Sequence, residues 1–123
     1  LPHNYVPNCV AYTGTHDNDT TAGWFQRISP EQRTRILQEL GTNGAQIHVD
    51  VIHLALRSPA QTAVIPLQDV LGLGIEARMN RPGTPRGNWE WRVAAAQLTD
   101  ELAGWMRELT EDSGRSPGSP HRI

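Results

Sequence analysis

The sequence contains no lysine, has a single cysteine and lacks any long apolar run. All eleven basic residues are arginine, and the formal net charge is −2, so no basic surface for nucleic acid or anionic lipid is expected. Cys9 alone cannot build an internal disulfide framework. This suits a reducing compartment, and we expect a cytoplasmic protein. No stretch approaches the roughly twenty apolar residues of a membrane span.

The chain is rich in residues that interrupt regular structure. Its hydrophobic content is 37% without its eleven glycines, and it has nine prolines; the ~45–50% typical of a globular domain counts glycine as well. The 123 residues suffice for one modest core. The composition indicates a loop-rich globular segment. The chain opens at Leu1 rather than Met and without a signal-peptide pattern, so we expect a piece of a longer protein.

Two short apolar runs predict strands that pair in parallel. Residues 9–14, CVAYTG, carry the β-formers Val10 and Tyr12. Residues 62–67, TAVIPL, form the continuous apolar run of a buried parallel strand. Helical patterns fill the crossover from about residue 29 to residue 58. Strand, helix, helix, strand is the order of a parallel α/β unit.

The two crossover helices have recognisable boundaries. Ser29 is the expected N-cap of the first helix, Gln32 completes a capping box, and Gly41 lies just past the end. The second helix is expected over residues 45–58, where apolar residues recur at helical spacing and Pro59 ends the pattern.

The last third of the chain predicts a loop, a helix and a tail. Residues 74–92 contain three glycines and two prolines and are expected to form a long loop. A final helix follows Thr99. The apolar residues expected on its inner face are Leu102, Trp105, Met106 and Leu109. We expect residues 1–112 to form the folded segment and residues 113–123, rich in serine, proline and glycine, to be disordered.

The polar stretch YTGTHDNDTTAGW, residues 12–24, directly follows the first predicted strand. It places His16, Asp17, Asn18 and Asp19 side by side, and α/β barrel enzymes carry their chemistry at such strand ends. Asp and Asn also favour ordinary turns and helix caps. The stretch by itself is therefore compatible with an active-site loop or with a polar turn.

Four segments together resemble the C-terminal part of the amylomaltases, which are 4-α-glucanotransferases (disproportionating enzymes) of the α-amylase superfamily. They are HNYVPN, YTGTHDNDTTAGW, VIPLQDVLGLG and ARMNRPGTPRGNWEWR, in this order along nearly the whole chain. The resemblance implies an α/β fold, the C-terminal fragment of a (β/α)₈ TIM barrel with about the last two β/α units plus a C-terminal helix. Residues 9–15 would be the seventh strand and residues 62–67 the eighth. The partner of this segment would be the missing N-terminal part of the barrel, and both strands would be left with exposed edges without it.

The same resemblance implies an activity, the transfer of α-1,4-glucan segments to the 4-hydroxyl of an acceptor glucan with retention of configuration. The implied substrates are α-1,4-glucans and malto-oligosaccharides, and no metal or organic cofactor is implied. Retaining chemistry needs a carboxylate nucleophile and a carboxylic acid. In the family both lie upstream of this segment, so we expect the isolated chain to be inactive.

The resemblance also assigns roles to single residues. Asp17 matches the family carboxylate that stabilises the transition state, where an ionised group near the sugar hydroxyls favours developing oxocarbenium charge. His16 matches the histidine that binds hydroxyls in the donor subsite, and Asn18 has a supporting role in orientation. Asn80 matches an asparagine near the donor-side sugars.

Further residues are assigned by position. Gln68 and Asp69 lie at the end of the predicted eighth strand, where such barrels place groups that touch or support the substrate. Asp19 and Thr20 are expected to cap or brace the loop. Trp89 and Trp91 alternate in NWEWR, and we expect packing under the final helix, with a sugar-binding platform as the alternative.

Two other functions are compatible with these residues. One is a metal-dependent hydrolase that uses His16, Asp17 and Asp19, and the other is a non-catalytic carbohydrate-binding or interaction module. His48 and His53 do not strengthen the metal hypothesis, because a spacing of five residues takes them off a common helical face.

Overall fold

The computed structural model describes residues 1–117 and divides the chain into two compact units. Unit 1 consists of residues 1–12, residues 53–64 and the C-terminal stretch from Val93. Unit 2 consists of residues 13–52 and 65–92. Within the described part, no helix is long and apolar enough to cross a membrane.

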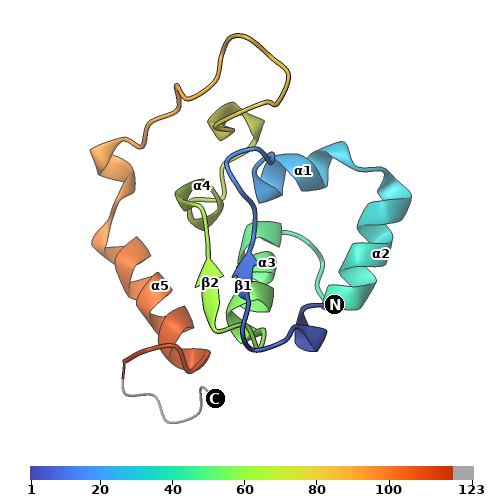
Figure 1. Cartoon of the computed structure of the whole chain (residues 1–123), viewed down its shortest axis with the longest axis vertical. Helices are drawn as coiled ribbons and strands as arrows, with labels where there is room; N and C mark the ends of the chain where they lie inside the picture. Colours follow the sequence, from blue (N-terminus) through green and yellow to red (C-terminus); the bar gives the residue numbers. More distant parts are fainter. Residues whose placement is uncertain (118–123) are drawn as a thin grey trace. The chain divides into compact units, whose positions relative to one another are not determined.

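Unit 1 contains a parallel pair of strands, β1 (Val10–Tyr12) and β2 (Thr62–Val64), which lie side by side in Figure 1. In register, Ala11 lies opposite Ala63. The predicted parallel pairing is confirmed. Both strands are shorter than predicted. After β2 the chain turns at Pro66 into the single helical turn α4 (Leu67–Val70), because proline has no N–H for a ladder bond and is well placed just before a helix.

The strands leave several large side chains uncovered, as expected for a sheet without further neighbours. Val10, Tyr12 and Val64 are 46%, 55% and 41% exposed, whereas Ala11 is 4% exposed. The described residues form a sheet of these two strands alone. The uncovered face and the unpaired outer edges of this two-stranded sheet favour association with another chain or segment.

The crossover helices form where local sequence signals place them. In α2 (Pro30–Leu40), the Ser29 hydroxyl accepts a bond from Gln32 N at 3.2 Å, and the Gln32 side chain accepts one from Ser29 N. Gly41 ends the helix with φ of 70°, a conformation that glycine adopts at low cost. The second helix, α3 (Ile47–Arg57), ends two residues before Pro59.

Unit 2 also contains a helix that the sequence analysis did not predict, α1 (Thr21–Arg27). Its residues have modest helix propensity, so tertiary contacts and capping stabilise it. The Thr20 hydroxyl accepts a hydrogen bond from Gly23 N at 3.1 Å, and Phe25 is 6% exposed. The expected capping role of Thr20 is thus confirmed, although the helix that it caps, α1, was not predicted from the sequence.

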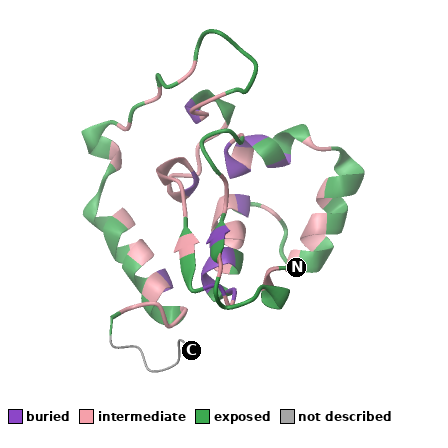
Figure 2. Cartoon of the chain, viewed as in Figure 1, coloured by how far each residue is buried: buried purple, intermediate pink, exposed green. Residues whose placement is uncertain are grey.

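The chain ends in α5 (Asp100–Asp112), which Thr99 caps by accepting a bond from Leu102 N at 3.1 Å. All four residues predicted for its inner face are at least partly buried, and Leu109 is 7% exposed. Short 3₁₀ turns occur at Pro2–Asn4 (η1), Ile75–Ala77 (η2) and Ala95–Gln97 (η3). Figure 2 shows buried residues gathered on α3 and the start of α1, with α2 and the loop after η2 mostly exposed.

Part of the predicted tail is hydrogen-bonded within unit 1. The Arg115 guanidinium donates to the backbone oxygens of Leu56, Ser58, Ala60 and Gln61 at 2.7, 3.2, 2.8 and 3.3 Å. The remainder of that prediction concerns residues 118–123, which lie outside the described residues.

Candidate active site

Two segments far apart in the sequence meet in unit 2, the loop that follows β1 and the ARMN segment that follows η2. Asn80 Nδ2 donates to Asp17 Oδ1 at 2.7 Å, and Asn80 N donates to His16 O at 3.1 Å. Arg78 Nη2 donates to Asp17 O at 2.8 Å. Two of these hydrogen bonds fix the backbone and the carboxylate of Asp17, and the third holds the backbone of His16. Arg78 was not singled out from the sequence, although it lies only two residues before Asn80.

His16 and Asp17 are both accessible to a ligand. His16 Nε2 lies 3.4 Å from Asp17 Oδ1, and their side chains are 58% and 49% exposed. An exposed pair of this kind contributes little to stability. Its accessibility instead leaves carboxylate and imidazole free to bind hydroxyl groups.

Asn18 shapes the loop from within. Its Oδ1 accepts hydrogen bonds from Thr15 N at 2.7 Å and from Thr15 Oγ1 at 3.0 Å. Asparagine commonly stabilises tight turns by bonding to nearby backbone in this way. The side-chain oxygen of Asn18 is thus engaged in holding the turn that presents His16 and Asp17.

Asp69 closes the base of the same loop. Its carboxylate, in a residue only 2% exposed, accepts bonds from Thr13 Oγ1 at 2.7 Å, Thr21 N at 2.8 Å and Thr21 Oγ1 at 2.9 Å. Thr13 and Thr21 stand on either side of the His16–Asp17 turn. The sequence predicts that Asp69 lies near the site, but its role depends on Thr21 at the start of α1, a helix that the sequence does not predict.

Replacing Asp69 with alanine is expected to lower the free energy of unfolding by about 1–3 kcal/mol, the cost of leaving buried donors without an acceptor. Urea unfolding followed by circular dichroism measures the change. Asp50→Ala is the control, because it removes a carboxylate that is only partly buried and accepts one bond, from Thr42. If the two variants lost the same free energy of unfolding, the buried hydrogen bonds of Asp69 would contribute no more than the single bond of Asp50.

Gln68 supports the neighbouring turn. Its Nε2 donates to Ala77 O at 3.2 Å, which ties α4 to η2. Gln68 also lines a cavity of about 60 Å³ together with His16, Asp69 and Arg78. The structure therefore brings Gln68 next to the loop, with its amide nitrogen already bonded.

Asp19 belongs to the start of α1. Its Oδ1 accepts from Thr20 N at 2.8 Å, and its Oδ2 lies 3.4 Å from Arg27 Nε with the side chain 1% exposed. A Cβ at position 23 would lie 2.5 Å from Asp19 Oδ1, so Gly23 makes room for the carboxylate. Residues 1–117 contain no group of three or more His, Cys, Asp or Glu side chains placed to hold a metal ion. Asp19 thus braces the loop, as expected.

His48 packs behind the site against Gly72, where φ is 68° and a Cβ would lie 2.8 Å from the imidazole. Burial lowers the pKa of His48, and the nearby carboxylates of Asp69 and Asp50 offset part of this effect. The imidazole therefore remains neutral in the folded state at pH values where it is already protonated in the unfolded chain.

Folding stability is accordingly expected to fall as the pH drops below 6.5 toward the lowered pKa of His48. In that window the unfolded state binds the extra proton, so stability rises with pH. Urea unfolding at several pH values between 5 and 7.5, compared with His48→Gln, isolates this contribution. If the free energy of unfolding of His48→Gln depended on pH as it does in the parent, His48 would not be the cause of the loss of stability.

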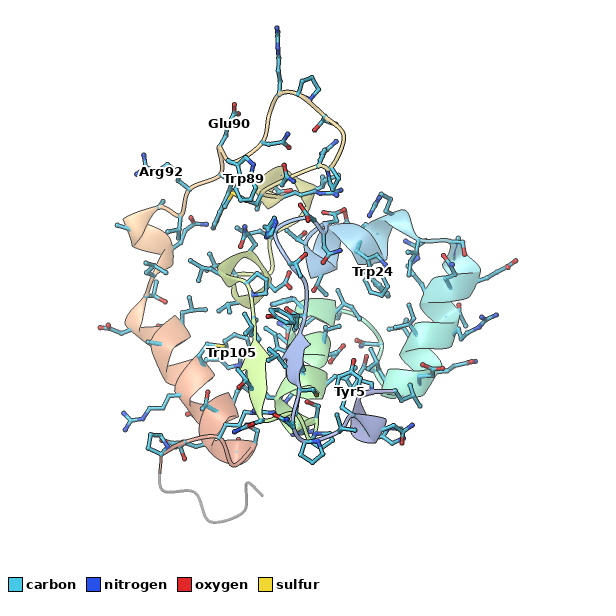
Figure 3. The ribbon with its side chains drawn as sticks, viewed as in Figure 1. Tyr5, Trp24, Trp89, Glu90, Arg92 and Trp105 are labelled. Carbon is cyan, nitrogen blue, oxygen red and sulfur yellow. The ribbon has the colours of Figure 1, made fainter. Side chains whose placement is uncertain are left out.

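Trp89 is not packed as the sequence analysis expected. Its side chain, labelled in Figure 3, is exposed, with 61% of the residue accessible. Its ring centroid lies 5.2 Å from that of His16. The packing prediction was therefore wrong for Trp89, whereas Trp91 is partly buried.

Comparison with known proteins identifies the group to which these residues belong. A family model described as 4-alpha-glucanotransferase matches residues 1–99. The chain belongs to this family. Over 117 residues it is 50% identical to the 4-alpha-glucanotransferase of Synechocystis sp., covering 94% of this chain and 23% of that protein. It is 42% identical to that of Thermus thermophilus, covering 94% of this chain and 25% of the relative.

A solved structure supports the same assignment. The amylomaltase from Streptococcus agalactiae in complex with acarbose matches with a TM-score of 0.89 and 33% identity, over 94% of this chain and 24% of that one. The chain is therefore a small α/β segment that matches part of an amylomaltase structure. It spans about a quarter of the length of the curated relatives it matches.

Proposed function

We propose that this chain acts as the C-terminal part of a 4-α-glucanotransferase, contributing about the last two β/α units of a (β/α)₈ barrel. In this proposal β1 is the seventh strand and β2 the eighth. Their parallel pairing and the exposed side chains of Val10, Tyr12 and Val64, which share one face, support it, because a closed barrel would cover that face and supply a neighbour at each outer edge. The upstream part of the barrel is then the principal partner.

The proposed role of Asp17 is to stabilise the transition state. The observation that carries this proposal is the 2.7 Å bond from Asn80 Nδ2 to Asp17 Oδ1, which joins the two motif segments across 63 positions. His16 and Asn80 are proposed to bind hydroxyls of the donor sugar beside this carboxylate. Asn18 and Gln68 support the site through the bonds that hold its turns.

The proposed reaction is a retaining double displacement. An upstream carboxylate attacks C1 of the donor glucosyl unit while an upstream carboxylic acid protonates the departing 4-oxygen. The 4-hydroxyl of an acceptor then attacks C1, the same acid–base residue takes its proton, and the covalent bond to the nucleophile breaks. Asp17, ionised near the ring, favours the positive charge that develops at C1 and the ring oxygen in both steps.

The proposed substrates are α-1,4-glucans and malto-oligosaccharides. Binding of acarbose by the related amylomaltase from Streptococcus agalactiae supports a glucan-type ligand. The reaction as proposed uses carboxyl groups alone and calls for no metal or organic cofactor. We also propose a cytoplasmic location, on the single cysteine.

A chimeric enzyme, called the joined enzyme, tests the proposal. In it, this chain replaces the segment that it matches in the Synechocystis 4-alpha-glucanotransferase. The joined enzyme is expected to convert maltotriose into glucose and longer malto-oligosaccharides. A folded joined enzyme that lacks this activity would contradict the proposed function.

A further inference from the structure

Trp89 has a backbone conformation that a bulky residue rarely adopts. Its φ is 63°, and no other residue besides glycine has a positive φ within residues 1–117. Such a conformation costs free energy and persists only where surrounding contacts hold it. Trp89 N donates to Met79 O at 2.7 Å, and Arg81 N donates to Asn88 Oδ1 at 2.8 Å. These bonds close the loop and fix the backbone that carries the indole.

The indole held in this way is exposed beside the polar cluster. Trp89 is 61% exposed, and its ring plane is inclined by 37° to that of His16, whose centroid lies 5.2 Å away. In Figure 3 the neighbouring Glu90 and Arg92 extend outward from the chain. A hollow of about 570 Å³ is lined by residues 84–90 and by Asn80. This volume lies within the range of ~300–1,000 Å³ that is usual for ligand sites.

We propose that Trp89 is a platform on which a glucosyl unit stacks, next to the unit held by Asp17 and His16. The inference rests on the proposed function and adds a binding residue to it. A pyranose ring presents an apolar face of C–H groups with hydroxyls at its rim. The indole offers a flat apolar surface. Asn80 lines the same hollow, and its amide is bonded to the carboxylate of Asp17 at 2.7 Å, so both groups are available for the hydroxyls.

A purely structural role for Trp89 predicts different effects of its removal on kcat and KM. If the indole only held the His16 ring in place, removing it would act through the contacts of His16 with the reacting sugar and lower kcat by a larger factor than it raised KM. A platform contributes to the binding of the ground state and transition state alike, so its loss raises KM and leaves kcat nearly unchanged.

The test uses the joined enzyme with acarbose as the binding probe and maltotriose as the substrate. Trp89→Gly removes the ring and relieves the backbone conformation, so it should fold at least as well as the parent. We expect it to weaken acarbose binding and raise KM about ten-fold, with kcat within three-fold, as for loss of one aromatic contact. Trp89→Phe keeps a ring and should retain most of the affinity. The matched control is Trp24→Phe, on α1.

Tryptophan fluorescence supplies a second readout. Acarbose should change the emission of the parent and of Trp24→Phe, and that change should disappear in Trp89→Phe. Acarbose binding within two-fold of the parent in Trp89→Gly would overturn the platform, as would a fall in kcat without a rise in KM. If the parent joined enzyme neither binds acarbose nor acts on maltotriose, the proposed function itself fails.

Discussion

Replacing Asp17 with asparagine in the joined enzyme is expected to lower kcat by about 10²–10³-fold, the scale for removing one preorganised electrostatic group. The amide keeps the size of the side chain and can still accept from Asn80 Nδ2, which bonds Asp17 Oδ1 at 2.7 Å. The negative charge that faces the developing oxocarbenium ion is lost. Steady-state release of glucose from maltotriose measures the effect.

Asp112→Asn is the matched control for this substitution. It removes an exposed carboxylate at the end of α5 and should leave kcat unchanged. A fall of less than ten-fold for Asp17→Asn would mean that Asp17 shapes the loop without stabilising the transition state.

The isolated chain is expected to show no disproportionation of maltotriose above a buffer blank. Asp17 can supply one carboxylate, but retaining transfer also needs a nucleophile and a general acid, which require two further carboxyl groups. Asp19 and Asp69 are unsuited to these roles. The Asp19 side chain is 1% exposed and lies near Arg27, and Asp69 is 2% exposed and accepts three hydrogen bonds.

Glucose assays on rigorously purified chain test this expectation, and addition of the upstream part of the Synechocystis relative as a separate polypeptide extends the test. Turnover by the chain alone at a rate comparable to that of the joined enzyme would require a different set of catalytic residues.

Elements with complete local signals were predicted well from the sequence. The helix α2 carries its own start in Ser29 and Gln32 and its own end in Gly41, so its bounds depend little on the rest of the chain. The helix α1 has no such independence. It follows from the Thr20 cap and from the burial of Phe25, and burial is a property of the fold rather than of the local sequence.

In the candidate site, too, some features could be predicted from the local sequence and others depend on the fold. Resemblance to the amylomaltases singled out Asp17 and Asn80, but the bond between them joins positions 63 residues apart, and no periodicity encodes it. Likewise, the exposure of Trp89 depends on a positive φ and on the bond to Met79, neither of which the alternation in NWEWR reveals. Contacts across long separations and unusual backbone angles required the structure.

In the function that we propose, this chain completes a glucanotransferase site by adding the carboxylate of Asp17. Its most direct test is glucose release from maltotriose, measured side by side for the isolated chain, the joined enzyme and the joined enzyme with Asp17→Asn. We expect no activity above the blank for the first, clear activity for the second and a loss of about 10²–10³-fold for the third. Equal activity of the joined enzyme with and without Asp17 would contradict it.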